Sequence, residues 1–226
     1  MLTDNQIERY SRHIILQEVG GRGQEALLGS SVALVGQGEL IATAALYLAA
    51  AGVGSLALPR EHIAYLHGLN DDVRLTAVED FTVEALADMA DVVICGAAPR
   101  ATAAAVNAAC VARGTPLLWG TAQGDVGSIA LFASAGDDRP CLACLTALPA
   151  VPGARAAGTT FLAAPVASMV GSLLAGEAMK VVLGVGELRT GRLWVFAGHD
   201  AAMRDVTIPR DPACRVCAPS GGSSGR

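Results

Sequence analysis

The stretch from Ser30 to Arg60, SSVALVGQGELIATAALYLAAAGVGSLALPR, decides the fold of this chain. A short apolar run, a glycine turn, an alanine-rich segment and a second apolar run follow one another. This order predicts strand, turn, helix and strand, a unit that normally holds a phosphate against backbone N–H groups at the helix N-terminus. Ile41 replaces the third glycine of that motif, and an acid, Glu39, stands at the helix start. The stretch therefore predicts the scaffold of a nucleotide site with altered chemistry.

Composition favours one soluble domain. The chain has 226 residues, 52% of them hydrophobic, which is enough for one sizeable core. A net charge of −5 and the absence of basic runs argue against nucleic acid or an acidic membrane surface as partner. The N-terminus is polar, and the longest apolar stretches are rich in small residues, so they are interpreted as buried helices. We expect a cytoplasmic protein with no membrane segment.

The segments after Arg60 predict a Rossmann-like, doubly wound α/β fold with a mostly parallel sheet. Further strands are predicted over 73–78, 91–95 and 116–119, and they alternate with helices over 82–89, capped by Thr82, and 101–111. A strand over 127–133 has no helix after it, so the sheet should become mixed at that edge. No secondary structure is predicted over 60–72.

The remaining predicted elements lie at the two ends. A capping box of Thr3 and Gln6 predicts a first helix over about 4–17, broken by the glycines at 20–23, with a short helical turn over 24–28. Near the other end we expect a helix over 165–183 and a hairpin of 192–196 with 203–208.

We expect a single domain over residues 1–218. It comprises an N-terminal helical segment (1–30), a Rossmann-like core (31–135) and a metal-linked C-terminal part (136–218). A Pro/Gly/Ala-rich loop is expected over 149–158, and the Gly/Ser-rich tail 219–226 is expected to be disordered.

Four of the six cysteines form two C-x-x-C pairs, Cys141 with Cys144 and Cys214 with Cys217. Two such pairs can complete a tetrahedral, all-cysteine zinc site, which is closed and therefore structural. The alternatives are free thiols or a redox pair, although a redox pair usually opens a helix and neither pair is predicted to do so. Cys95 and Cys110 are expected to be buried core residues.

Several segments together resemble the ThiF/MoeB/HesA family, relatives of the ubiquitin-activating enzymes. They are residues 9–16 (RYSRHIIL), 23–27 (GQEAL), 32–58, Gly171-Ser172, 177–180 (EAMK) and both cysteine pairs. The resemblance implies a homodimer or a heterodimer with a family member, and a structural zinc on Cys141, Cys144, Cys214 and Cys217. It also implies binding of ATP and magnesium, and adenylation of the C-terminal glycine of a ubiquitin-like sulfur carrier protein.

The family's catalytic positions mostly differ here, so no catalytic residue is assigned. Glu39 and Ile41 replace glycines, and Pro59-Arg60 replaces an aspartate that holds the ribose. The magnesium-binding aspartate should fall near Ala97-Ala98, where no acid stands. The Asn/Arg/Gln cluster and lysine that follow in the family have no counterpart in the short span 61–72, so that segment is interpreted as deleted. Lys180 is the only lysine in the chain.

Three residues of the nucleotide site are retained: Gly36, Gly38 and Arg12, which in the family can reach a phosphate across the dimer. The alternative for Arg12 is a surface pair with Glu8. The crossover loop 149–160 lacks the reactive cysteine of some relatives. The four histidines are expected to face solvent, with His62 and His67 as candidates for lining a remodelled pocket, and Trp119 and Trp194 are expected in the core or at an interface.

These observations favour a family member that keeps the fold and zinc but has lost adenylation, with ATP and magnesium unlikely as cofactors. It would act as a binding or dimer partner in sulfur-carrier chemistry. The alternative is an active ATP-dependent adenylyltransferase that activates the carrier's C-terminus. A dinucleotide-dependent oxidoreductase shares the glycine turn but explains neither the cysteine pairs nor the N-terminal segment.

Overall fold

The computed structural model describes residues 1–133, 139–148 and 161–218. An eight-stranded sheet with the order β3-β2-β1-β4-β5-β6-β7-β8 runs through it. The five strands β1 to β5 pair in parallel, and β6, β7 and β8 add antiparallel pairs at one edge. The strands are β1 (Ser31–Gly36), β2 (Ser55–Leu58), β3 (Arg74–Ala77), β4 (Val92–Gly96), β5 (Leu117–Gln123), β6 (Val126–Phe132), β7 (Arg192–Ala197) and β8 (Ala202–Thr207). The predicted doubly wound fold with a mixed edge is confirmed.

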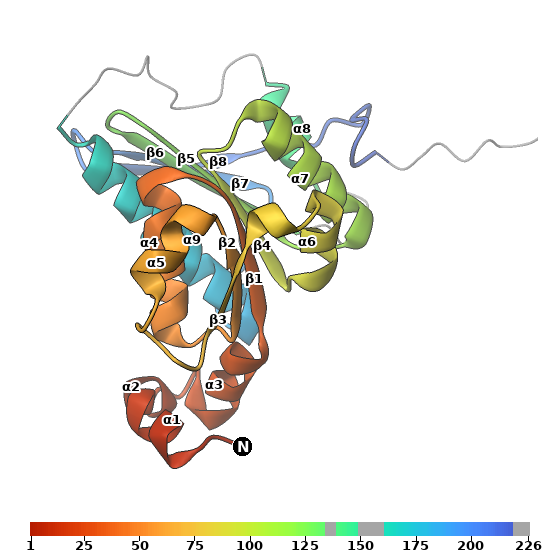
Figure 1. The fold of residues 1–226 in the computed structure, drawn as a ribbon. Helices are drawn as coiled ribbons and strands as arrows, with labels where there is room; N and C mark the ends of the chain where they lie inside the picture. The colour runs from red at the N-terminus through yellow and green to blue at the C-terminus, as the bar shows by residue number, and fades with distance from the viewer. Residues whose placement is uncertain (134–138, 149–160, 219–226) are drawn as a thin grey trace, which may run out of the picture.

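Helices cover both faces of the sheet (Figure 1). The helices α4 and α9 pack on one face, and α6 and α7 pack on the other. The helices are α1 (Asp4–Arg9), α2 (Ser11–Ile14), α3 (Gly20–Gly29), α4 (Gly38–Ala51), α5 (Arg60–Leu66), α6 (Val83–Met89), α7 (Arg100–Arg113), α8 (Leu142–Thr146) and α9 (Ala163–Leu183), with a 3-10 turn over Val78–Asp80.

The helix α9 lies directly against α4. A Cβ added to Gly171 would lie 2.4 Å from the carbonyl oxygen of Leu40, so only glycine allows this approach. By length and composition α9 could also cross a membrane, with a mean hydropathy of 1.5 and 33% of its most apolar window buried. Core helices pass the same test, and here α9 packs on β5, β6 and α4.

The N-terminal helix is shorter than predicted. The capping box of Thr3 and Gln6 is present, but α1 ends at Arg9 and α2 begins at Ser11. Tyr10, at the break, is 2% exposed; its hydroxyl donates to Asp72 at 3.0 Å and accepts from Asn70 at 2.8 Å. Burial raises the pKa of Tyr10 to about 12. The two helices separate because this tyrosine turns inward to the buried Asn70 and the half-buried Asp72.

Two predictions around the glycine turn unit are wrong. The glycines at 20–23 do not break a helix but lie inside α3. A Cβ on Gly23 would meet Leu183 of α9 at 3.1 Å, so this glycine permits close packing of two helices. Residues 60–66, for which no element was predicted, form α5. The loop 149–158, the crossover loop 149–160 and the tail 219–226 lie outside the described residues.

Candidate functional site

The glycine turn keeps the backbone of a nucleotide-binding motif. Gly36 has φ +135°, and a Cβ there would lie 1.6 Å from the carbonyl oxygen of Gly96. Gly38, at the start of α4, has φ +75° and open space where a Cβ would stand. Both positions therefore favour glycine, Gly36 because β1 and β4 almost touch and Gly38 because of its left-handed backbone.

Ile41 does not crowd the approach of α4 to the sheet. Its side chain is fully buried in the core. Gly96 of β4 makes room for the neighbouring Leu40, because a Cβ on Gly96 would lie 2.4 Å from Leu40 Cδ2, whereas it would meet Ile41 Cδ1 only at an ordinary contact distance of 3.5 Å.

Glu39 lies in the first turn of α4, where its carboxylate is fixed by two hydroxyl groups. Its Oε1 accepts hydrogen bonds from Ser168 of α9 at 3.2 Å and from Thr43 at 3.4 Å. The backbone N–H groups of this turn would otherwise attract an anion. A negative side chain is therefore already tethered where a phosphate would approach.

The positions that follow β2 and β4 are also reorganised. Pro59 precedes α5, and the guanidinium of Arg60 pairs with Asp80 at 2.7 Å. Ala97, directly after β4, is a non-glycine residue with φ +50° and carries no ligand atom on its side chain. Lys180 is bound to Glu177 at 2.8 Å and to the carbonyl oxygen of Glu187 at 2.9 Å.

Arg12 and the histidines take varied positions. Arg12 is exposed, and within residues 1–133, 139–148 and 161–218 no ion pair joins it to Glu8. His67 and His199 face solvent as predicted. His62 does not: it is 8% exposed, and its Nε2 lies 3.4 Å from Glu61 without a hydrogen bond. His13 is half-buried and shares a hydrogen bond with Gln24 at 3.0 Å.

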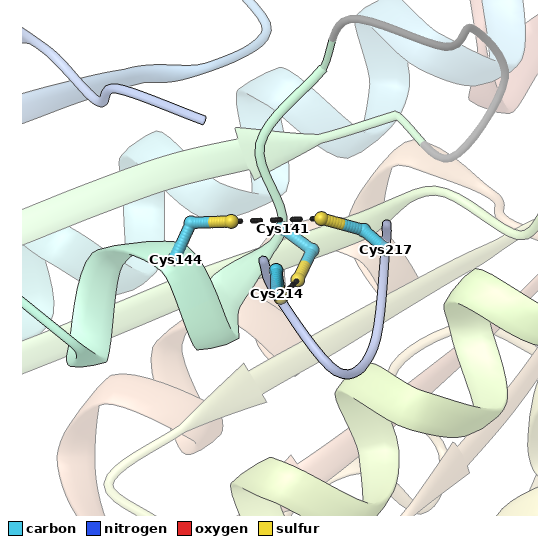
Figure 2. Close-up of side chains that lie close together, drawn as sticks. All are labelled: Cys141, Cys144, Cys214 and Cys217. Carbon is cyan, nitrogen blue, oxygen red and sulfur yellow. Dashed lines mark hydrogen bonds between the residues drawn. The ribbon is translucent and has the colours of Figure 1, made fainter. Parts of the chain in front are cut away.

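The four cysteines of the two C-x-x-C pairs come together, although the second pair follows the first by 73 positions in the sequence (Figure 2). The Sγ atoms of Cys141 and Cys214 lie 3.8 Å apart, and those of Cys144 and Cys217 lie 3.5 Å apart. All four sulfurs fall within 4.8 Å of one another. A tetrahedral zinc with Zn–S bonds of about 2.3 Å separates its sulfurs by about 3.8 Å. The donor set therefore fits a zinc ion.

The surroundings of these thiols shift their pKa values in different directions. Burial raises the pKa of Cys141 and of Cys217. Burial also acts on Cys214, but hydrogen bonds from the backbone of Cys217 and Val216 outweigh it and lower the pKa of Cys214 to about 7.

One expectation about the first cysteine pair is wrong. Cys141 is the N-cap of the short helix α8, so this pair does open a helix. The redox alternative loses the objection based on local structure. The closeness of all four sulfurs still favours a metal, because a metal uses both pairs at once.

Asn107 on α7 completes the cysteine cluster, and the sequence analysis missed it. Its Oδ1 accepts a hydrogen bond from the backbone N–H of Leu142 at 3.0 Å, and its Nδ2 donates to Cys141 Sγ at 3.5 Å. Asn107 is 1% exposed. The sequence did carry a signal for this residue: Asn107 is an amide three positions before Cys110, on the apolar face of a helix.

Cys95 and Cys110 are buried, as predicted. Burial raises the pKa of each thiol to about 12, so neither is a thiolate near neutral pH. Trp119 and Trp194 are only half-buried, and Trp119 lines a cleft of about 270 Å³ at the carboxyl ends of β4 and β5.

Comparison with known proteins agrees with this geometry. The ThiF family model matches residues 10–59 and 63–216. The chain is 34% identical to the sulfur carrier protein ThiS adenylyltransferase of Escherichia coli K12, covering 99% of this chain and 98% of that relative. It is 31% identical to the molybdopterin-synthase adenylyltransferase of the same organism, covering 96% and 98% of the two chains. The first alignment runs over 253 positions, more than the 226 residues here, so it contains gaps in this chain.

A solved structure shares the fold at low identity. Escherichia coli MccB, solved with ATP, superposes with a TM-score of 0.71 at 19% identity, covering 92% of this chain and 74% of its own. The match to the family model is interrupted only at residues 60–62, directly after β2. The break overlaps the start of the short connection 61–72 that was interpreted as a deletion, and the match resumes at residue 63. By its sequence and its fold, the chain belongs to the ThiF family.

Proposed function

We propose that this protein binds the C-terminal tail of a ubiquitin-like sulfur carrier protein and does not activate it with ATP. A sulfur carrier is proposed as the partner because relatives of this chain are named as adenylyltransferases of sulfur carrier proteins. The observation that argues against activation with ATP is the carboxylate of Glu39, which accepts hydrogen bonds from Ser168 and Thr43 at the first turn of α4.

Electrostatics support this proposal. Nucleotide phosphates and a carboxylate at one helix N-terminus repel each other. Adenylyl transfer also develops negative charge that a metal ion or cation must stabilise. Ala97 offers no metal ligand after β4, and the one lysine, Lys180, is held by Glu177 and Glu187. The described residues therefore do not fit ATP with magnesium.

An active adenylyltransferase is the second candidate. The relatives favour it more than the first, because they are named as adenylyltransferases over nearly the whole length of this chain. They give no sign that activity has been lost. The two candidates share the carrier and differ only in whether ATP binds.

Calorimetry separates the two candidates. We expect Escherichia coli ThiS to bind the purified protein and ATP with magnesium to give no saturable heat, with the ThiS adenylyltransferase of Escherichia coli as the positive control. Glu39→Gln removes the charge with little change of shape, and we expect it not to restore ATP binding because the acid after β4 and a free lysine are still missing. An adenylyl group on ThiS, detected by mass spectrometry after incubation with the unaltered protein, ATP and magnesium, would establish the second candidate.

We also propose that Cys141, Cys144, Cys214 and Cys217 hold one structural zinc ion as thiolates. Four sulfur ligands fill a tetrahedral site and leave no position for substrate, so this metal would stabilise the fold and take no part in a reaction. Pairing of the chain with a second copy or with a related chain stays a prediction.

A further inference from the structure

Arg210 carries a buried donor that has no acceptor among the described residues. This arginine lies between β8 and the second cysteine pair, and its Nη2 donates to the carbonyl oxygen of Cys217 at 3.1 Å. Its Nε is buried and makes no hydrogen bond within residues 1–133, 139–148 and 161–218. A guanidinium stays charged in proteins, so each of its buried N–H groups needs an acceptor. The Nε of Arg210 therefore lacks a partner that its chemistry requires.

The positive charge of Arg210 is also without a counter-charge. In the part of the chain that the structure describes, no acid forms an ion pair with it. The adjoining acid, Asp211, is used elsewhere. Its Oδ1 accepts a hydrogen bond from the backbone N–H of Ala213 at 2.8 Å, and its carbonyl oxygen accepts from the N–H of Cys214 at 3.0 Å. An unpaired cation thus stands beside the turn that presents Cys214 and Cys217.

The cysteine cluster supplies the missing charge once it holds zinc. Four thiolates carry twice the charge of one Zn²⁺ ion, so the loaded site is negative. A negative centre is costly away from water unless donors and cations face it.

The sulfur of Cys217 is the ligand that lacks such a donor. Asn107 donates to the sulfur of Cys141 at 3.5 Å, and backbone N–H groups donate to that of Cys214. Among the described residues, the hydrogen-bond partners of the Cys217 sulfur are other cysteine thiols, with Cys144 at 3.5 Å. Zinc binding removes the protons of those thiols, so they can no longer donate. The Cys217 thiolate then needs a new donor.

We propose that Arg210 is a positioning residue of the metal site, whose guanidinium faces the Cys217 thiolate as donor and counter-charge when zinc is bound. The hydrogen bond from Nη2 to the carbonyl oxygen of Cys217 already holds the guanidinium against this residue. The donors of an arginine lie in a rigid fork, so they can engage the carbonyl oxygen and the sulfur of one residue together, which the single ammonium of a lysine matches poorly. This inference rests on the proposed zinc site and adds a charged residue that donates no ligand atom.

Zinc affinity, measured on the full chain by competition with a coloured chelator, tests this role. Arg210→Gln removes the charge and should lower the affinity about tenfold or more, as is typical of residues that support metal ligands. Arg210→Lys keeps the charge but not the fork, so it should restore part of the affinity. Arg215→Gln is the matched control, because Arg215 stands between Cys214 and Cys217 but is exposed. It should leave the affinity unchanged.

Two further measurements distinguish an effect on the metal from a general loss of stability. Cobalt in place of zinc gives a thiolate-to-metal charge-transfer band, whose energy responds to hydrogen bonds at the sulfurs. Arg210→Gln should shift this band, and Arg215→Gln should not. Thermal unfolding gives the second comparison. Because Nε has no partner without the metal, Arg210→Gln should lower the melting temperature of the zinc-loaded protein more than that of the chelator-treated protein.

Unchanged zinc affinity together with an unshifted cobalt band in Arg210→Gln would overturn the role of Arg210 and leave the zinc site standing. Equal losses of melting temperature with and without zinc would also overturn it, since Arg210 would then support only the fold. Should the unaltered protein bind neither zinc nor cobalt, the proposed zinc site and the role of Arg210 both fail.

Discussion

Asn107 shows how one side chain links two parts of the molecule. Its amide bonds the backbone of Leu142 and the sulfur of Cys141 together, from a fully buried position on α7. A hydrogen bond to a thiolate stabilises the charged ligand and fixes its direction. Asn107 is therefore a positioning residue for the proposed zinc site, although it donates no ligand atom.

Replacing Asn107 by alanine should lower the zinc affinity about tenfold or more, in line with other residues behind metal ligands. The variant also leaves the N–H of Leu142 buried without a partner, which costs about 1–3 kcal/mol of folding stability. Competition with a coloured chelator measures the affinity. Asn107→Asp keeps an acceptor for Leu142 but replaces the donor to Cys141 with a buried carboxylate, so it should lower both the zinc affinity and the stability. Equal zinc affinity in all three proteins would contradict this role.

At the same scale, single residues were predicted unevenly from the sequence. The four cysteines stand out because their type and spacing are rare outside metal and redox sites. Asn107 and the burial of His62 could not be predicted, since a lone polar residue reveals its partners only after distant segments pack together.

The elements followed from local pattern wherever apolar residues form an uninterrupted strand or a helix begins with a capping residue. Thr82 is such a case, since its side chain accepts a hydrogen bond from the backbone N–H of Ala85. Prediction failed where tertiary contact overrides local preference. Gly23 lies within α3, where the absence of a side chain lets α9 pack close to it. The N-terminal helix breaks at Tyr10, because the hydroxyl of Tyr10 is hydrogen-bonded to the buried Asn70.

The turn between β1 and α4 offers a matched pair of substitutions. Gly36→Ala should reduce the free energy of unfolding by about 3 kcal/mol or more, because its Cβ would collide with backbone of β4. Gly38→Ala should cost about 1–2 kcal/mol, for its left-handed backbone alone, since open space surrounds it. Urea unfolding measures both values. Equal losses at the two positions would mean that β1 and β4 are not held as closely as described.

For the whole molecule, the cysteine cluster joins α8 to the C-terminal end of the fold, and both segments border the cleft. Cys144→Ser should reduce the zinc content from about one ion per chain. It should also lower the melting temperature by about 5–10 °C, because a closed thiolate site contributes folding energy directly. Cys110→Ala, which removes a buried thiol outside the cluster, should leave the zinc content unchanged.

Elemental analysis and thermal unfolding, each with and without a strong chelator, measure both effects in the same samples. A protein free of metal with unchanged melting temperature would rule out the structural zinc.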